Sequence, residues 1–329
     1  MPTCSQSRQV GPWPERPRLA PREVGCTAPG VENAFPSGRA AILASLRLVG
    51  GLSPDSVVAT PECVTGCVAN AVRRHSRPVS LSAALTHRTD EVSAVIVYEQ
   101  WGWPFPPDVE DNLRERLLGV QVIVDRVDSA DFFASTRTFG AFEVLSLSKV
   151  LGTAAGGLAR QHRDPRYLRF EPTDRTRPAP STNHPGLVSH PAVRELFKQS
   201  DHVHPSVIRW LAENCAITAV EAECYARGSA ARLLLESRLS AGWPAWMTQA
   251  IEAGGGPVWA PVLRGGEPRI HWRAVEHLAR AWGIRAAVRM FNWSGNPLSP
   301  RFEPCVALPI HGGVACVAEI VRDSLGLDP

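Results

Sequence analysis

The chain has 329 residues, 44% of them hydrophobic, and a formal net charge of +3 at pH 7. This length can bury one large domain and a smaller one, and the near-balanced charge gives no reason to expect nucleic acid or a membrane surface as a partner. Residues 1–22 lack the apolar segment of a secretory signal, and no apolar run reaches the roughly 20 residues of a membrane-spanning helix, so we expect a cytoplasmic protein.

The cysteines give no sign of a metal site. The chain has eight of them and none forms a CxxC pair. Cys63 and Cys67 are four residues apart and would share one face of a helix, but no Cys or His pair stands at a spacing that would complete a metal site. We therefore predict reduced, buried thiols and no metal.

The first 30 residues are rich in Pro and Arg, which predicts an extended arm, able to pack on a partner subunit. The pattern changes at Ser37, which is a candidate N-cap for a helix over residues 38–46. Strands and helices then alternate. Strands are expected at residues 56–60, 94–98, 120–124, 142–147 and 157–160, and helices at 64–74 and 109–118.

Near-continuous apolar strands separated by helices are typical of a mainly parallel sheet covered on both faces. We therefore predict an α/β fold with a three-layer αβα large domain over residues 31–240. Residues 161–191, rich in Pro, are expected to form a long irregular loop, and residues 206–240 a long helix.

Residues 241–329 predict a smaller C-terminal α/β domain. Its expected elements are a strand at 257–263, a helix at 272–282 that Gly283 ends, a strand at 306–309 and a final helix at 314–325.

Ligands of parallel α/β sheets bind beyond the carboxyl ends of the strands. The first candidate at that edge is Ser37-Gly38-Arg39, at a helix start. Its free N–H groups and the helix dipole would suit a phosphate, and Gly38 would let the backbone approach closely. The alternative is an ordinary helix cap.

The second candidate is Asp125, directly after the strand at 120–124. A buried carboxylate needs a partner, because an unpaired buried charge is costly. Asp125 either holds the protonated ring nitrogen of a cofactor or caps the segment that follows it.

The third candidate is Lys149, in the segment Ser146-Leu147-Ser148-Lys149. Lysine is rare in this chain: Lys149 and Lys198 are the only two, and Lys198 stands at a solvated helix position. Partial burial at a strand end would lower the pKa of the Lys149 amine and make it a nucleophile. Ser146 and Ser148 could donate hydrogen bonds to a phosphate.

In this order, a phosphate loop, an Asp and a Lys resemble the fold type I enzymes that use pyridoxal 5′-phosphate (PLP), and among them the DegT/DnrJ sugar aminotransferase family. The matching residues are Ser37-Gly38-Arg39-Ala40-Ala41, Val57-Val58-Ala59-Thr60-Pro61, Val122-Ile123-Val124-Asp125, Lys149 with Gly156-Gly157, and Ala307-Leu308-Pro309. The resemblance implies that Lys149 forms the Schiff base with PLP, that Asp125 binds the pyridine nitrogen, and that Ser37, Gly38, Arg39 and Ser146 contribute to the cofactor site.

The chain also departs from that family. Thr65 stands where the family has an aromatic residue on the cofactor ring, and Asp128 stands where Gln or His is common. Val144 stands where the family has its phosphate serine. The partner-subunit motif is not recognisable, and His202-Val203-His204 stands near its place.

The leading hypothesis is a PLP-dependent aminotransferase that uses an amino donor and a small carbonyl acceptor: a keto-sugar, a cyclitol or a keto acid of specialised biosynthesis. A donor carboxylate would need an Arg, with Arg289 and Arg301 as candidates. The alternatives are a PLP lyase, racemase or cyclase on the same fold, and an accessory homologue without activity. The resemblance further implies a homodimer, with His202 and His204 reaching the partner's cofactor.

Overall fold

The computed structural model describes residues 33–62, 66–87, 91–132, 139–153, 155–162, 217–237, 239–310, 314 and 318–326. The predicted arm at 1–30, most of the loop at 161–191 and the start of the helix expected at 206–240 lie outside the described residues. None of the helices within these ranges is long and apolar enough to cross a membrane.

The larger sheet has seven strands in the order β1-β7-β6-β5-β4-β2-β3. The strands are β1 (Asn33–Phe35), β2 (Val57–Thr60), β3 (Arg77–Ser80), β4 (Ala94–Tyr98), β5 (Gln121–Asp125), β6 (Phe142–Ser146) and β7 (Gly157–Gln161). Strands β2 to β6 pair in parallel, whereas β7 runs antiparallel to β6, and β1 antiparallel to β7. The prediction of a mainly parallel sheet is confirmed.

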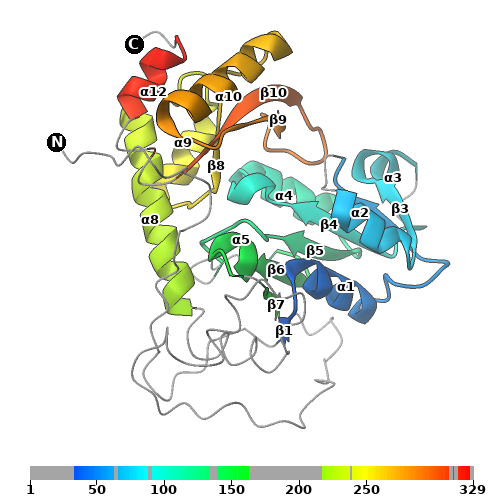
Figure 1. The fold of residues 1–329 in the computed structure, drawn as a ribbon. Helices are drawn as coiled ribbons and strands as arrows, with labels where there is room; N and C mark the ends of the chain where they lie inside the picture. The colour runs from blue at the N-terminus through cyan, green and yellow to red at the C-terminus, as the bar shows by residue number, and fades with distance from the viewer. Residues whose placement is uncertain are drawn as a thin grey trace, which may run out of the picture.

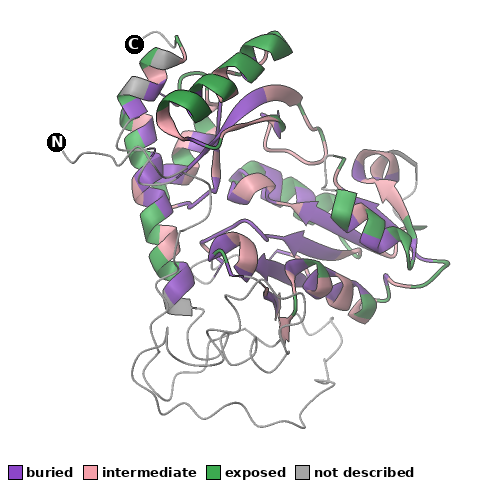
Figure 2. Cartoon of the chain, viewed as in Figure 1, coloured by how far each residue is buried: buried purple, intermediate pink, exposed green. Residues whose placement is uncertain are grey.

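Helices cover both faces of this sheet, because successive residues of a strand point to opposite sides. The helices are α1 (Gly38–Leu48), α2 (Gly66–Arg73), α3 (Leu81–His87) and α4 (Pro107–Arg116). Ile96 of β4 packs in one core with residues of α1 and α2, and its neighbour Val97 packs in another with residues of α3 and α4. Figure 2 shows β4, β5 and β6 buried between these layers. The three-layer αβα prediction is therefore confirmed.

A second, antiparallel sheet has the order β8-β10-β9. Its strands are β8 (Trp259–Val262), β9 (Ala287–Asn292) and β10 (Phe302–Pro309), and the helices around it are α8 (Ile217–Glu236), α9 (Ala245–Glu252), α10 (Pro268–Trp282) and α12 (Ala318–Ser324). Gly283 ends α10 in the left-handed conformation, as its position in the sequence predicts.

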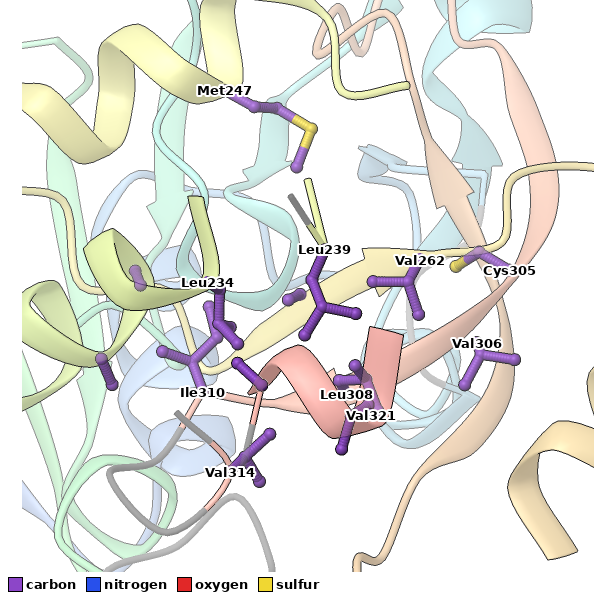
Figure 3. Close-up of a cluster of buried hydrophobic side chains, with 14 of the residues drawn as sticks. Leu234, Leu239, Met247, Val262, Cys305, Val306, Leu308, Ile310, Val314 and Val321 are labelled. Atoms are coloured by element: carbon purple, nitrogen blue, oxygen red, sulfur yellow. The ribbon is translucent and has the colours of Figure 1, made fainter. Parts of the chain in front are cut away.

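The core of the second sheet draws on every helix around it (Figure 3). Leu234 of α8, Met247 of α9, Leu308 of β10 and Val321 of α12 are among its buried residues. Figure 1 shows α8 running from this sheet down alongside the larger one. Helix α8 precedes residue 240 in the chain, yet it contributes to the core of the smaller sheet. The domain boundary at residue 240 therefore stays a prediction.

Candidate active site

Three neighbouring parallel strands end at one cavity. Tyr98 ends β4, Asp125 ends β5 and Ser146 ends β6, and Tyr98 stands opposite Asp125 in the sheet register. Within the described residues the cavity has a volume of about 140 Å³. Its lining consists of Ser37, Gly38, Arg39, Ile42, Cys67, Val68, Tyr98, Asp125, Val127, Ser146, Ser148 and Lys149. The sheet therefore brings the three candidates from the sequence together.

Helix α1 begins at this cavity. The Ser37 hydroxyl accepts a hydrogen bond from the Ala40 amide at 3.2 Å, so Ser37 is the N-cap that the sequence predicts. A Cβ atom on Gly38 would lie 2.9 Å from Val127 Cγ1 and 3.0 Å from Ser146 Cβ. Only glycine therefore lets the α1 N-terminus come this close to the ends of β5 and β6.

The glycine pair Gly156-Gly157 also lets the segment before α1 lie close to the sheet. The Gly156 amide donates to the Pro36 carbonyl at 2.8 Å, and a Cβ on Gly157 would overlap the backbone of Ser37. Strand β7 thus holds the segment before α1 in place, which gives the Gly-Gly pair a packing reason.

Asp125 is buried, with 2% of its surface exposed. Its Oδ1 atom accepts a hydrogen bond from the Val127 amide at 3.1 Å, so the side chain caps its own turn as well as lining the cavity. Burial raises the pKa of Asp125 to about 7, although nearby Lys149 and the Val127 amide act in the opposite direction. A cation in the cavity would stabilise the ionised carboxylate.

Asp128 joins Tyr98 and Lys149 in one polar cluster. Its Oδ2 atom accepts a hydrogen bond from the Tyr98 hydroxyl at 2.6 Å and one from Lys149 Nζ at 3.3 Å. Burial and the Asp128 carboxylate raise the pKa of Tyr98 well above its usual value. Tyr98 therefore keeps its proton and orients Asp128 towards Lys149.

The expectation for Lys149 needs a correction. Burial lowers the pKa of its amine, as the sequence suggests, but the carboxylates of Asp128 and Asp125 outweigh that effect and the pKa is raised. The side chain, 35% exposed, lies in the turn α5 (Leu147–Val150) directly after β6. The carboxylates of Asp128 and Asp125 thus favour the ammonium form of Lys149.

Two hydroxyl groups lie beside this turn. Ser146 Oγ and Ser148 Oγ are 2.9 Å apart and both residues line the cavity together with Arg39. Hydroxyl groups, a guanidinium and helix N-terminal amides are the groups that bind a phosphate in proteins.

A buried ionic network supports the turn behind Asp125. The guanidinium of Arg126 contacts Glu99 at 2.9 Å, Asp131 at 2.6 Å and Glu143 at 3.5 Å. Removing one member would leave the others as uncompensated buried charges, which costs several kcal/mol, roughly 3–5. The network therefore fixes the segment between Asp125 and Asp128 from behind.

The remaining candidates lie elsewhere. Thr65, Lys198, His202 and His204 lie outside the described residues. Arg289 and Arg301 do not line this cavity, and Arg301, with 73% of its side chain exposed, pairs with Glu303 at 3.3 Å. Within the described residues, Arg39 is the arginine at this cavity.

Sequence reasoning missed Tyr98, Cys67 and Val68, which also line the cavity. Tyr98 carried a signal that was available: it ends an apolar strand expected at residues 94–98, much as Asp125 follows the strand expected at residues 120–124.

The comparisons agree with this geometry. Residues 28–162 match the family model described as "Putative PLP-dependent aminotransferase". No curated protein sequence matches the chain. Among solved structures, 3-amino-5-hydroxybenzoic acid (AHBA) synthase is similar with a TM-score of 0.55 and 15% identity, over 91% of this chain and 88% of that one.

Two further structures are similar at low identity. The PLP form of "Putative sugar aminotransferase Spr1654" from Streptococcus pneumoniae has a TM-score of 0.57 and 14% identity, over 89% of this chain and 86% of that one. DesI, solved in the presence of its TDP-sugar product, has a TM-score of 0.51 and 16% identity, over 91% and 81%. At these identities the likeness shows the fold. The chain therefore has the fold of these PLP-dependent enzymes, and its residues 28–162 match the sequence model of a PLP-dependent aminotransferase family.

Proposed function

We propose that the chain transfers an amino group from a donor to a small carbonyl acceptor, a keto-sugar, a cyclitol or a keto acid, as a step of specialised biosynthesis. The observation that carries the proposal is the arrangement of Asp125 and Lys149. They face one cavity from adjacent strands, beside the N-terminus of α1.

The residues present fit PLP. Gly38 lets the N-terminus of α1 pack against Val127 and Ser146, so the α1 amides, the Ser146 and Ser148 hydroxyls and Arg39 all face one cavity and are available to hold the phosphate. Asp125 offers a buried carboxylate that gains from a neighbouring positive charge, which a protonated pyridine nitrogen supplies. Lys149 offers the amine.

Bound PLP would supply an electron sink for the negative charge that develops at the substrate carbon. Asp125 would keep a proton on the ring nitrogen and so maintain that sink. Lys149 Nζ would carry the proton that leaves and returns at the substrate carbon, as a general base and acid. Asp128, fixed by Tyr98, would hold Lys149 within the cavity whenever its amine is free.

The test is to incubate purified protein with PLP and a panel of amino donors and to follow the visible spectrum of the cofactor. Conversion to the pyridoxamine form, and its reversal by a carbonyl acceptor, supports transamination. A substrate-dependent spectrum without that conversion would instead indicate a lyase, racemase or cyclase. No spectral change with any donor, in protein that binds PLP, would favour an accessory homologue.

We further propose that the enzyme works as a homodimer with its cofactor sites at the subunit boundary. The support is the resemblance to fold type I enzymes together with the apolar residues of the arm and loop, which need a surface on which to pack.

A further inference from the structure

Arg227 is a buried arginine that faces the active-site turns from outside the cavity. It lies on α8, and 1% of its surface is exposed. Its guanidinium donates to the Asp128 carbonyl at 3.2 Å and to the Val150 carbonyl at 2.9 Å, with the Lys149 carbonyl at 3.5 Å. Its Nε atom donates to Glu223, one turn earlier on the same helix, at 2.6 Å.

These carbonyls belong to the two turns that carry the Asp128–Lys149 ion pair. One turn follows β5 and the other follows β6, so a single planar group with donors in fixed directions joins them. Hydrogen bonds from a charged donor are stronger than neutral ones, and a buried carbonyl left without its donor is costly. The Arg227 guanidinium therefore resists any change in the distance between the two turns.

Helix α8 also belongs to the core of the smaller sheet. Ala230 and Ala231, one turn beyond Arg227, and Leu234, two turns beyond it, are buried in that core. Figure 1 shows α8 reaching from the smaller sheet to the level of α5, the turn that holds Lys149. Arg227 thus connects the smaller sheet to the lysine turn.

We infer that Arg227 is a positioning residue that holds the Lys149–Asp128 ion pair at its distance of 3.3 Å and so controls how readily Lys149 gives up its proton to react with PLP. The inference rests on the proposed role of Lys149 as the cofactor lysine.

The groups that face Lys149 determine the direction of the effect. Within the described part of the chain, the carboxylates of Asp128 and Asp125 act on it from β5 and its turn, and Cys67 acts from α2. Tyr98 from β4 and Arg39 from α1 line the same cavity. The carboxylates raise the pKa of Lys149, so a looser contact with Asp128 leaves a larger neutral fraction of the amine at a given pH.

The test compares Arg227→Gln and Arg227→Lys with Arg232→Gln, which changes an exposed arginine on the same helix. Two rates are measured in PLP-free protein at about pH 8, well below the usual lysine pKa of roughly 10.4: capture of PLP by absorbance, and acetylation of Lys149 by acetic anhydride, mapped by mass spectrometry. We expect both rates to rise in Arg227→Gln, by about threefold or more. Arg227→Lys, which keeps the charge but lacks the planar guanidinium with its donors in fixed directions, should give a smaller rise, and Arg232→Gln none.

A residue that only stabilised the fold would lower the melting temperature without speeding either reaction, and that result would overturn the inference. If Arg227→Gln fails to fold, Glu223→Gln, which removes the charge that orients the guanidinium, gives the same comparison. If wild-type protein captures PLP elsewhere than on Lys149, the proposed function and this inference both fail. If wild-type captures it on Lys149 and the Arg227 and Glu223 variants react at the wild-type rate, the inference alone fails.

Discussion

Lys149 lies where the carboxyl end of β6 meets the cavity, and the chain contains a single other lysine, Lys198. Lys149→Ala should therefore abolish both activity and the PLP that borohydride fixes to the protein, because no other described residue offers an amine there. Lys149→Arg is the matched control: it keeps the positive charge near Asp128 and cannot form the covalent link. Peptide mapping of the reduced wild-type protein checks the assignment, and a label on Lys198 would contradict it.

We expect Asp128 to govern the reactivity of that amine. Its carboxylate raises the pKa of Lys149, so Asp128→Asn should lower that pKa and increase the neutral fraction. The neutral amine is the form that reacts, so PLP capture at about pH 8 should become faster, by about tenfold or more. Stopped-flow absorbance measures the rate. An unchanged or slower capture, with Tyr98→Phe as a control that keeps the carboxylate, would show that Asp128 does not govern Lys149.

Asp125 gives a prediction in which stability and activity change in opposite directions. Burial raises its pKa from 3.8 to about 7, so the folded PLP-free protein binds this proton more tightly than the unfolded chain does. The carboxylate therefore destabilises the fold increasingly as the pH rises from about 4 to about 7, by at most about 4 kcal/mol.

In PLP-free protein, Asp125→Asn should accordingly gain stability over wild type as the pH rises through this window, with little difference at the acidic end. The same variant should lose activity by a factor on the order of 10² or more, because the charge that keeps the ring nitrogen protonated is gone. Urea unfolding at several pH values and steady-state rates measure the two effects. A fully active Asn variant would remove Asp125 from the mechanism.

At the residue scale, the sequence predicted residues that line the cavity better than it predicted their hydrogen-bond partners. Three candidates could be named from the sequence because each stands at the end or start of a predicted helix or strand and is of a residue type that chemistry or close packing would explain there: Asp125, Lys149 and Gly38. Tyr98 and Arg227 could not be assigned roles in the same way. The Asp128 partner of Tyr98 is 30 residues away, and the carbonyl groups that accept from Arg227 are 77 or more residues away. These contacts exist only once the sheet and α8 have been packed.

At the scale of elements, the close approach of α1 to the sheet gives a prediction. Gly38→Ala would place a Cβ against Val127 and Ser146, so it should destabilise the fold by roughly 1–3 kcal/mol and weaken PLP binding. This sign is the reverse of the ordinary effect of alanine in a helix, which is a gain of up to about 1 kcal/mol.

Gly66, the first residue of α2, provides the control, because a Cβ there meets nothing within 4 Å. Gly66→Ala should be neutral or slightly stabilising, as judged by urea unfolding. Equal behaviour of the two variants would show that Gly38 is not required for the approach of α1.

The strands that the sequence predicted are more deeply buried than the strands that it missed. Strands β4, β5 and β6 are buried along almost their whole length, and their apolar runs identified them. Strand β3, Arg77-Pro78-Val79-Ser80, lies at the edge of the sheet, where Pro is tolerated and a polar sequence leaves no pattern. β1 has three residues, and β9 is largely half-exposed or exposed, so neither gives a period to recognise.

At the scale of the whole molecule, the order of strands was beyond the sequence. The prediction of parallel strands is confirmed for the centre of the larger sheet. Strand β7 is antiparallel to β6, because a short connection after α5 returns the chain beside it. The pairing of β7 with β1 joins residues more than 120 positions apart in the sequence. The smaller sheet was predicted as two strands and is completed by β9 between them in the chain. Long-range pairing of this kind is a property of packing, which local patterns do not encode.

The dimer is the prediction that belongs to the assembled enzyme. The arm at 1–30 and the loop at 161–191, which lie largely outside the described residues, have little apolar periodicity, yet they contain Trp13, Leu19, Tyr167, Leu168 and Phe170. A two-fold dimer gives each arm an identical surface on which to bury such side chains. Light scattering with and without PLP should therefore report twice the monomer mass, and a fully active monomer would contradict it.

If the partner supplies His202 and His204 to each cofactor site, mutants at the two positions should complement each other. Lys149→Ala protein and a His202→Ala, His204→Ala variant should each be impaired alone. In their mixed dimers one site carries both defects and the other carries neither, so an equal mixture at random should recover up to about a quarter of wild-type activity. Subunit exchange is verified first with differently tagged chains. No recovery after proven exchange, or full activity of the double His variant alone, would place the two histidines outside the shared site.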